Sequence, residues 1–164
     1  MRNSVWLLWV IVAAGCSGEN TAARVADLNR SNIQKAANLY SAYQMHNGVG
    51  PKDAATLKEF VSSGSGISPR RLEMMQIDLK NLDPIFISER DHKPFKLKPN
   101  VLAPSMTIAA VVFEDIGIDG KRQVAFNNGS VREVDDAKYK NLWENKDAEL
   151  QRDPEAEAAA KKSG

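Results

Sequence analysis

The chain has a single cysteine and two histidines among its 164 residues. One cysteine excludes an internal disulfide and any cysteine-cluster metal site, and two histidines leave little material for a histidine metal centre. Charge of one sign is also missing, because 22 Lys and Arg stand against 21 Asp and Glu, for a formal net charge of +1. This balance excludes the strong basic field of a dedicated nucleic-acid-binding protein. We therefore expect no metal, no cofactor and no nucleic-acid partner.

The sequence also lacks an apolar run long enough to cross a bilayer as a mature helix, which takes about 20 residues. Its longest run, Val5 to Ala14, is short and follows Arg2 at the N-terminus. A positive residue, a short apolar run and then small residues form the layout of a secretory signal peptide. We expect residues 1–15 to be that signal.

The segment Val12-Ala13-Ala14-Gly15-Cys16 resembles the lipobox of bacterial lipoproteins. The resemblance implies that the Cys16 thiol receives a diacylglycerol, that the signal is cut before it, and that the new amine is acylated. A thiolate is a strong nucleophile, and each buried CH₂ of a lipid adds about 0.8 kcal/mol of membrane affinity. Ser17 after the cysteine resembles the pattern of lipoproteins delivered to the outer membrane. The alternative is an ordinary secretory signal with an incidental cysteine.

The mature chain divides into three parts by composition. Residues 16–22 are small and polar and predict a lipidated tether, and residues 23–146 carry the apolar periodicity of a single domain. Residues 147–164 have little apolar surface to offset the entropy of ordering, which predicts a solvated, flexible tail. Removal of Arg2 with the signal lowers the basic count by one, so the mature chain is formally neutral.

Helical spacing of apolar residues predicts a long N-terminal helix from Ala23 to Asn47, ended by Gly48. Tyr40 and Tyr43 lie on its apolar stripe and are expected in the core rather than at a ligand. Two short helices follow: residues 54–61, capped by Asp53, and a segment that begins at Ser68-Pro69.

After residue 84 the period changes to that of strands. We expect strands at residues 85–87, 95–98, 106–113, 123–126 and 131–134, and then a helix capped by Asp135 or Asp136. The predicted fold class is α+β, with a long N-terminal helix, two short helices, an antiparallel sheet of about four or five strands, a C-terminal helix and the flexible tail.

A second resemblance concerns the head of this predicted domain. The helix 32–47 followed by Gly48-Val49-Gly50-Pro51, together with the ending Val124–Asp135 (VAFNNGSVREVD), looks like the pilin-like class of planctomycetes and the pseudopilins of type II secretion. The resemblance implies a shared head domain. The chain has Gly15-Cys16 where pilins carry a prepilin peptidase site, so a lipid at Cys16 would replace their membrane-embedded assembly helix.

No set of residues predicts catalysis. Neither His46 nor His92 has a Gly-x-Ser-x-Gly elbow to serve, and the neighbouring carboxylates Glu114 and Asp115 should point to opposite faces of a strand. We therefore expect no catalytic residue and no enzyme.

One exposed turn is a candidate for contact with a partner protein: Glu89, Arg90, Asp91 and His92. The leading hypothesis is a lipid-anchored protein of the cell envelope with a non-enzymatic structural or protein-interaction role, held to a membrane by Cys16 and facing an envelope protein partner. One alternative is a pseudopilin-related accessory of a secretion or pilus system. Another is a small secreted enzyme or ligand-binding module.

Overall fold

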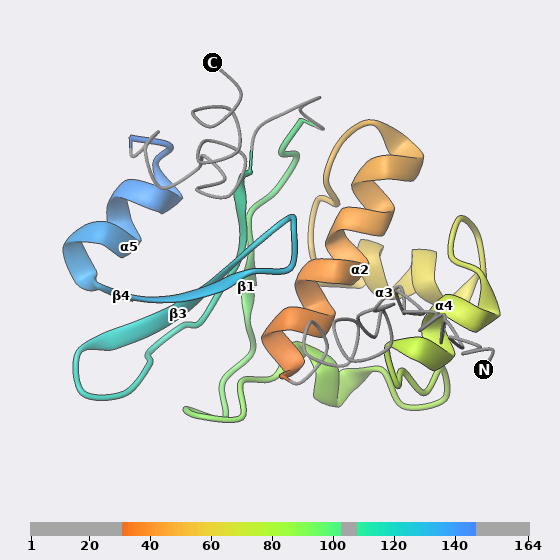
Figure 1. Cartoon of the computed structure of the whole chain (residues 1–164), viewed down its shortest axis with the longest axis horizontal. Coiled ribbons are helices and arrows are strands. Elements are labelled where there is room, and N and C mark those ends of the chain that lie inside the picture. The colour runs from red at the N-terminus through yellow and green to blue at the C-terminus, as the bar shows by residue number, and fades with distance from the viewer. Residues whose placement is uncertain (1–30, 103–107, 147–164) are drawn as a thin grey trace, which may run out of the picture.

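A four-stranded antiparallel sheet lies between two layers of helix (Figure 1). The computed structural model describes residues 31–102 and 108–146. The strands follow the order β1-β2-β3-β4: Lys96–Leu97, Ala110–Phe113, Lys121–Phe126 and Val131–Asp135. The helices are α2 (Asn32–Asn47), α3 (Ala54–Ser62), α4 (Pro69–Met74), the 3₁₀ helix η1 (Asp83–Phe86) and α5 (Asp136–Trp143). The α+β class and the antiparallel sheet predicted from the sequence are confirmed.

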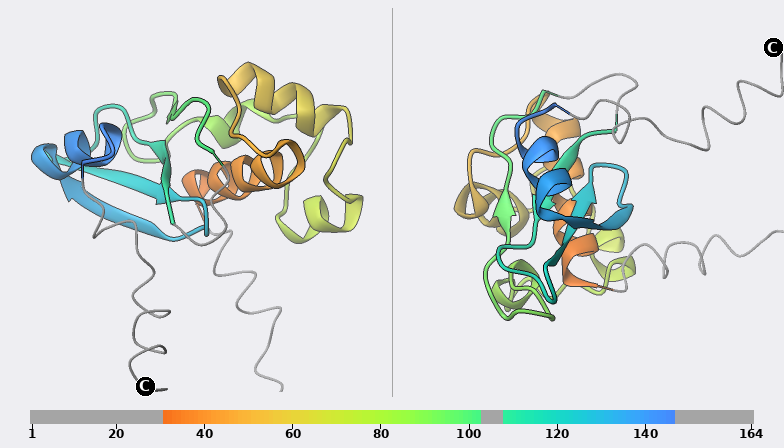
Figure 2. Two further views of the ribbon diagram at one scale, coloured as in Figure 1. Left: turned by 90° about the horizontal axis from the view of Figure 1, so that it is seen from above. Right: turned by 90° about the vertical axis from the view of Figure 1, so that its left-hand side faces the viewer.

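The sheet has a separate apolar core on each face. On one face α2, α3, α4 and η1 pack against residues such as Val111 and Ala125. On the other face α5 places Tyr139 and Leu142 against Phe113 and its neighbours. Figure 2 shows α2 and α5 on opposite sides of the strands. All four residues of β2 are apolar and buried, and β2 lies between β1 and β3, as the sequence predicted for a central strand.

The expected helix from Ala23 is wrong at its start. Ser31 has extended backbone angles (φ −113°, ψ 156°), and α2 begins at Asn32. The Ser31 N–H donates to Oε1 of Gln34 at 3.2 Å, one half of a capping box that starts a helix at this point. Residues 23–30 lie outside the described residues.

The expected strand at residues 85–87 is also wrong, because most of this segment is the 3₁₀ helix η1. Pro84 stands in its first turn, where the missing N–H of proline costs no hydrogen bond. Ile87 alone adopts strand geometry, in an isolated bridge with Pro94. The sheet therefore has four strands in the described chain, within the expected four or five.

The other boundaries follow local signals read from the sequence. Asp53 caps α3, Ser68 with Pro69 starts α4, and the Asp135 carboxylate accepts the N–H of Lys138 at 2.8 Å to start α5. Gly48 ends α2 in the left-handed conformation, at φ 75°. The strand expected at 106–113 is observed from Ala110, and residues 103–107 lie outside the described chain.

Tyr40 is fully buried, as its place on the apolar stripe predicted. Its hydroxyl donates to the carbonyl of Lys98 at 2.7 Å, which ties the middle of α2 to the end of β1. The signal, the tether with Cys16 and the tail at 147–164 all fall outside the described residues.

Candidate functional site

The turn that sequence reasoning selected for partner contact connects Ile87 to Pro94. Glu89 and His92 are exposed, as expected, and with Asn32 they line a shallow hollow of about 340 Å³ beside the start of α2. An oxygen of Glu89 accepts the N–H of Asn32 at 3.4 Å, where a carboxylate is favoured by the helix dipole. His92 has a left-handed backbone (φ 56°) that tightens the turn.

Asp91 binds main-chain groups of the same chain. Its carboxylate accepts the N–H groups of Ile116 at 2.9 Å, Gly117 at 2.8 Å and Lys93 at 2.9 Å. Burial raises the pKa of Asp91, but the N–H groups together outweigh burial and hold that pKa below its ordinary value. The residue therefore joins the 88–93 turn to the turn between β2 and β3.

Arg90 is also turned inward, toward a carboxylate that the sequence did not single out as buried. Its Nη1 lies 2.8 Å from Oε2 of Glu133 and 3.6 Å from Oε2 of Glu114. Glu114 is 0% exposed, accepts the Ser88 hydroxyl at 2.7 Å and accepts the N–H of Gln123 at 2.8 Å. The signal for this network was the first of two acidic residues, Glu114 and Asp115, directly after the apolar run of β2.

Glu114 and Asp115 do lie in different environments, as strand alternation predicted. Glu114 is internal, whereas Asp115 is paired with Lys96 at 2.5 Å and is partly exposed. The two carboxylates therefore do not form a pair for acid–base chemistry, and the polar atoms of Glu114 are already engaged by the protein.

Lys98 is a second internal charge, 7% exposed. Its ammonium group donates to the carbonyl of Leu142 at 2.7 Å and to Oδ1 of Asn145 at 2.6 Å, at the end of α5. A cation at this position is favoured by the negative end of the helix dipole. Burial nevertheless lowers the pKa of Lys98 to about 8, because the charged form is desolvated.

The outer edge of β4 is an open strand edge. The Phe126 N–H donates to the Ser130 carbonyl, so the main chain of Ser130 faces β3. Along an antiparallel strand, the N–H and C=O groups of successive residues point alternately toward one neighbouring strand and away from it. The main-chain groups of Arg132 and Val134 therefore face β3, while those of Glu133 and its odd-numbered neighbours face outward. Among the residues that the structure describes, no hydrogen bond reaches the outward groups of Val131 and Glu133, whereas the Asp135 carbonyl is the first acceptor of α5. At the opposite edge of the sheet, just before β1, the N–H of Phe95 donates to the Phe86 carbonyl at 2.9 Å.

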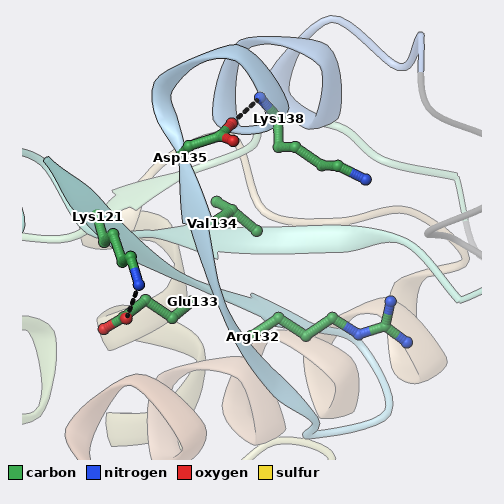
Figure 3. Close-up of a pocket in the computed structure, with 6 residues that line it drawn as sticks. All are labelled: Lys121, Arg132, Glu133, Val134, Asp135 and Lys138. Carbon is green, nitrogen blue, oxygen red and sulfur yellow. Dashed lines mark hydrogen bonds and ion pairs between the residues drawn. The ribbon is translucent and has the colours of Figure 1, made fainter.

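A shallow hollow of about 310 Å³ runs along this edge. Figure 3 shows its six lining residues, which come from β3, β4 and the start of α5: Lys121, Arg132, Glu133, Val134, Asp135 and Lys138. Arg132, Val134 and Lys138 point to one side of β4, and Lys121 and Glu133 to the other. Side chains that line the hollow therefore lie on both sides of the β4 main chain, and we call these side chains the strip.

The charges of this strip are unevenly matched. Lys121 lies 3.8 Å from Glu133, which is also paired with Arg90, and Asp135 caps α5. Arg132 lies over the Phe126 ring at 5.3 Å and Lys138 extends from the first turn of α5, and neither has an acidic partner among the residues that the structure describes. The side of β4 that faces α5 therefore carries two uncompensated positive charges.

Two kinds of site are absent from the described parts of the chain. Across residues 31–102 and 108–146, no three His, Cys, Asp or Glu side chains are grouped to hold a metal ion. No helix within these same ranges has both the length and the apolar character to span a membrane. His46 lies against the ring of Phe60 at 5.5 Å, at the far end of α2 from the turn that holds His92.

Comparison with known proteins adds no relative. No family model, no curated protein and no solved structure matches this chain. The function must therefore be argued from the residues themselves.

Proposed function

We propose that this chain is a lipid-anchored protein of the cell envelope that catalyses no reaction and binds a protein partner through the open edge of β4. One observation carries the binding role: the outward N–H and C=O groups of Val131 and Glu133 in β4 lack partners among the described residues, beside a hollow lined mostly by charged side chains. A partner that adds an extended segment to such an edge gains main-chain hydrogen bonds directly. The Cys16 context supports the anchor.

The internal charges support a binding role over a catalytic one. Glu114, Asp91 and Lys98 carry the polar groups that a reaction would use, and each engages the fold through hydrogen bonds of 2.6–2.9 Å. A general acid or base must reach a proton of the substrate, so these residues are poorly placed for such a role.

The anchor is tested by replacing Cys16 with serine in cells that make the protein. The wild-type protein should sediment with membranes, and its intact mass should equal residues 16–164 plus a diacylglycerol and an acyl chain. Cys16→Ser should lose the lipid and leave the membrane fraction. A Cys16→Ser protein that stays in the membrane fraction would disprove the lipid anchor.

The binding edge is tested by proline at position 133. The Glu133 N–H faces outward, so Glu133→Pro removes an edge donor and leaves the pairing with β3 intact. Glu133→Ala is the matched control, since it removes the same ion pair with Arg90 but keeps the N–H. A photo-crosslinking residue at Lys121 should capture one recurrent partner in wild-type and Glu133→Ala cells, and lose it in Glu133→Pro cells. Equal crosslinking in all three would rule out the edge.

A further inference from the structure

We infer that the β4 edge selects an extended acidic segment of a partner protein. In this segment an apolar residue has one acidic residue two positions before it and another two positions after it. Arg132 and Lys138 recognise the two carboxylates. This inference rests on the proposed function, because it assumes that the edge binds a partner strand. It adds the chemistry of that partner.

The spacing of the side chains sets the pattern of the partner. Successive residues of a strand point to opposite faces, so residues i, i+2 and i+4 of an added strand lie on one face, about 7 Å apart. On the side of β4 that faces α5, Arg132, Val134 and Lys138 follow one another along the edge (Figure 3). An acidic, an apolar and a second acidic side chain at alternate positions would each lie beside one of these three.

The charges on the two faces of the strand differ, and this difference decides toward which face the carboxylates of the partner point. On the side with Arg132, the nearby Arg122 and Asp136 pair with each other at 2.8 Å and leave no free carboxylate. On the other side, Glu133 is shared by Arg90 and Lys121. Positive charge is therefore in excess only on the side that faces α5. Opposite charges directly across strands are stabilising, and like charges are destabilising.

A second copy of this chain is a poorer fit to the same edge. In a two-fold pairing of β4 with itself, centring the axis on Arg132 or Glu133 places that residue opposite its own copy. Centring it on Val134 places Glu133 opposite Asp135 of the other copy. Each of these arrangements sets like charges against one another, and centring the axis on Val131 pairs β4 with residues of the turn before it instead of with a strand. The uncompensated cations therefore favour an acidic segment from a different protein.

The test measures binding of short labelled peptides to the full-length protein in detergent micelles, by fluorescence polarisation. The probe peptide is Thr-Glu-Thr-Val-Thr-Glu-Thr. One control replaces both glutamates with lysine, and another, Thr-Glu-Glu-Val-Thr-Thr-Thr, has the same composition but places its carboxylates on opposite faces. The probe should bind about tenfold more tightly than either control.

Two protein variants separate charge recognition from edge binding. The double variant Arg132→Glu, Lys138→Glu should reverse the preference toward the lysine peptide, whereas Lys80→Glu, an exposed cation elsewhere, should leave it unchanged. Glu133→Pro should abolish binding of every peptide. Circular dichroism confirms that each variant is folded, and the double glutamine variant at 132 and 138 provides a milder change with a smaller loss.

Several results would overturn the inference. Equal binding of the three peptides, or a preference that survives the double variant, means that these cations do not select the partner; loss of binding in Glu133→Pro would then still support the edge itself. Absence of binding by any peptide overturns the inference, and the crosslinking experiment decides the edge separately. A crosslink from position 121 to a second copy, or to residues 147–164 of the same chain, would identify a different occupant.

Discussion

Glu114, Asp91 and Lys98 each use their polar atoms on neighbouring parts of the same chain. Glu114 joins Ser88, Arg90 and the main chain of β3, and Lys98 joins β1 to the end of α5. A buried charge without partners costs several kcal/mol, so such residues are stable only where the fold supplies donors or acceptors. At the scale of the residue, the internal charges therefore hold segments together, and two cations without an acidic partner among the described residues, Arg132 and Lys138, lie at the β4 edge.

Replacing Glu114 with leucine should destabilise the domain strongly. The change leaves the Ser88 hydroxyl and the Gln123 N–H without their acceptor and removes a carboxylate from Arg90. We expect a loss of about 3 kcal/mol in the free energy of unfolding, measured by urea denaturation. Glu133→Gln, at a side chain that is 43% exposed, should cost less than about 1 kcal/mol. Equal losses would mean that burial of Glu114 contributes nothing.

Lys98 should make stability depend on pH above neutrality. Burial lowers its pKa from 10.5 to about 8 in the folded protein, so between these values the unfolded chain binds more protons at this site. The free energy of unfolding should therefore rise with pH from about 8 toward 10.5; below pH 8 Lys98 is charged in both states, so it adds no pH dependence there. Burial raises the pKa of Tyr40 to about 12, which favours unfolding only above about pH 10.

The Lys98 effect is measured by urea denaturation at several values between pH 8 and about pH 9.5, below the range where tyrosine ionises. Wild-type stability should rise across this interval, and Lys98→Met should show a flatter curve. A rise of the same size in Lys98→Met would assign the pH dependence to another group.

At the scale of the element, local sequence signals decide where some helices begin, and tertiary contacts decide the structure of other segments. The starts of α3, α4 and α5 follow from capping side chains a few residues away, which is why the sequence predicted them. The segment 85–87 has the apolar character of a strand, yet η1 forms there because Pro84 favours a helical turn and because the segment must meet the start of α2. The capping box of Ser31 and Gln34 was a readable signal that the long apolar stripe obscured.

The connection from α2 to α3 depends on the absence of a side chain at Gly50. A Cβ at this position would overlap the hydroxyl of Tyr40, which is hydrogen bonded to Lys98. Gly50→Ala should therefore cost about 2–3 kcal/mol, because the ring must shift from a packed site. Gly48→Ala is the control: it has open space and costs only the strain of a left-handed alanine, about 1 kcal/mol. Thermal melting should rank the two in that order.

At the scale of the whole molecule, the sheet separates two apolar cores. Lys98 links them, since its carbonyl accepts the hydroxyl of Tyr40 in the first core and its ammonium group donates to the end of α5 beside the second. The arrangement leaves β4 at one edge with α5 beside it, so the proposed binding surface draws on both a strand and a helix. A lipid at Cys16 would hold this surface near a membrane.

Deletion of residues 147–164 should leave the melting temperature nearly unchanged, because the composition of this segment predicts a solvated tail. A longer deletion that starts at residue 144 should lower the melting temperature clearly, since it removes Asn145, an acceptor for the buried Lys98. Differential scanning calorimetry of the two truncated proteins checks both. A large drop for the shorter deletion would show that the tail packs on the domain.

The sequence by itself determined the α+β class, the starts of α3, α4 and α5, the end of α2 at Gly48 and the burial of Tyr40, because these depend on periodicity and on contacts a few residues apart. It offered Glu89 and His92 as exposed residues, and the role of that turn in partner contact stays a prediction. Only the tertiary structure decided that Glu114 and Lys98 are internal and that β4 has the open edge. Strand order and the pairing of buried charges join segments tens of residues apart, and no local pattern encodes which of them will meet.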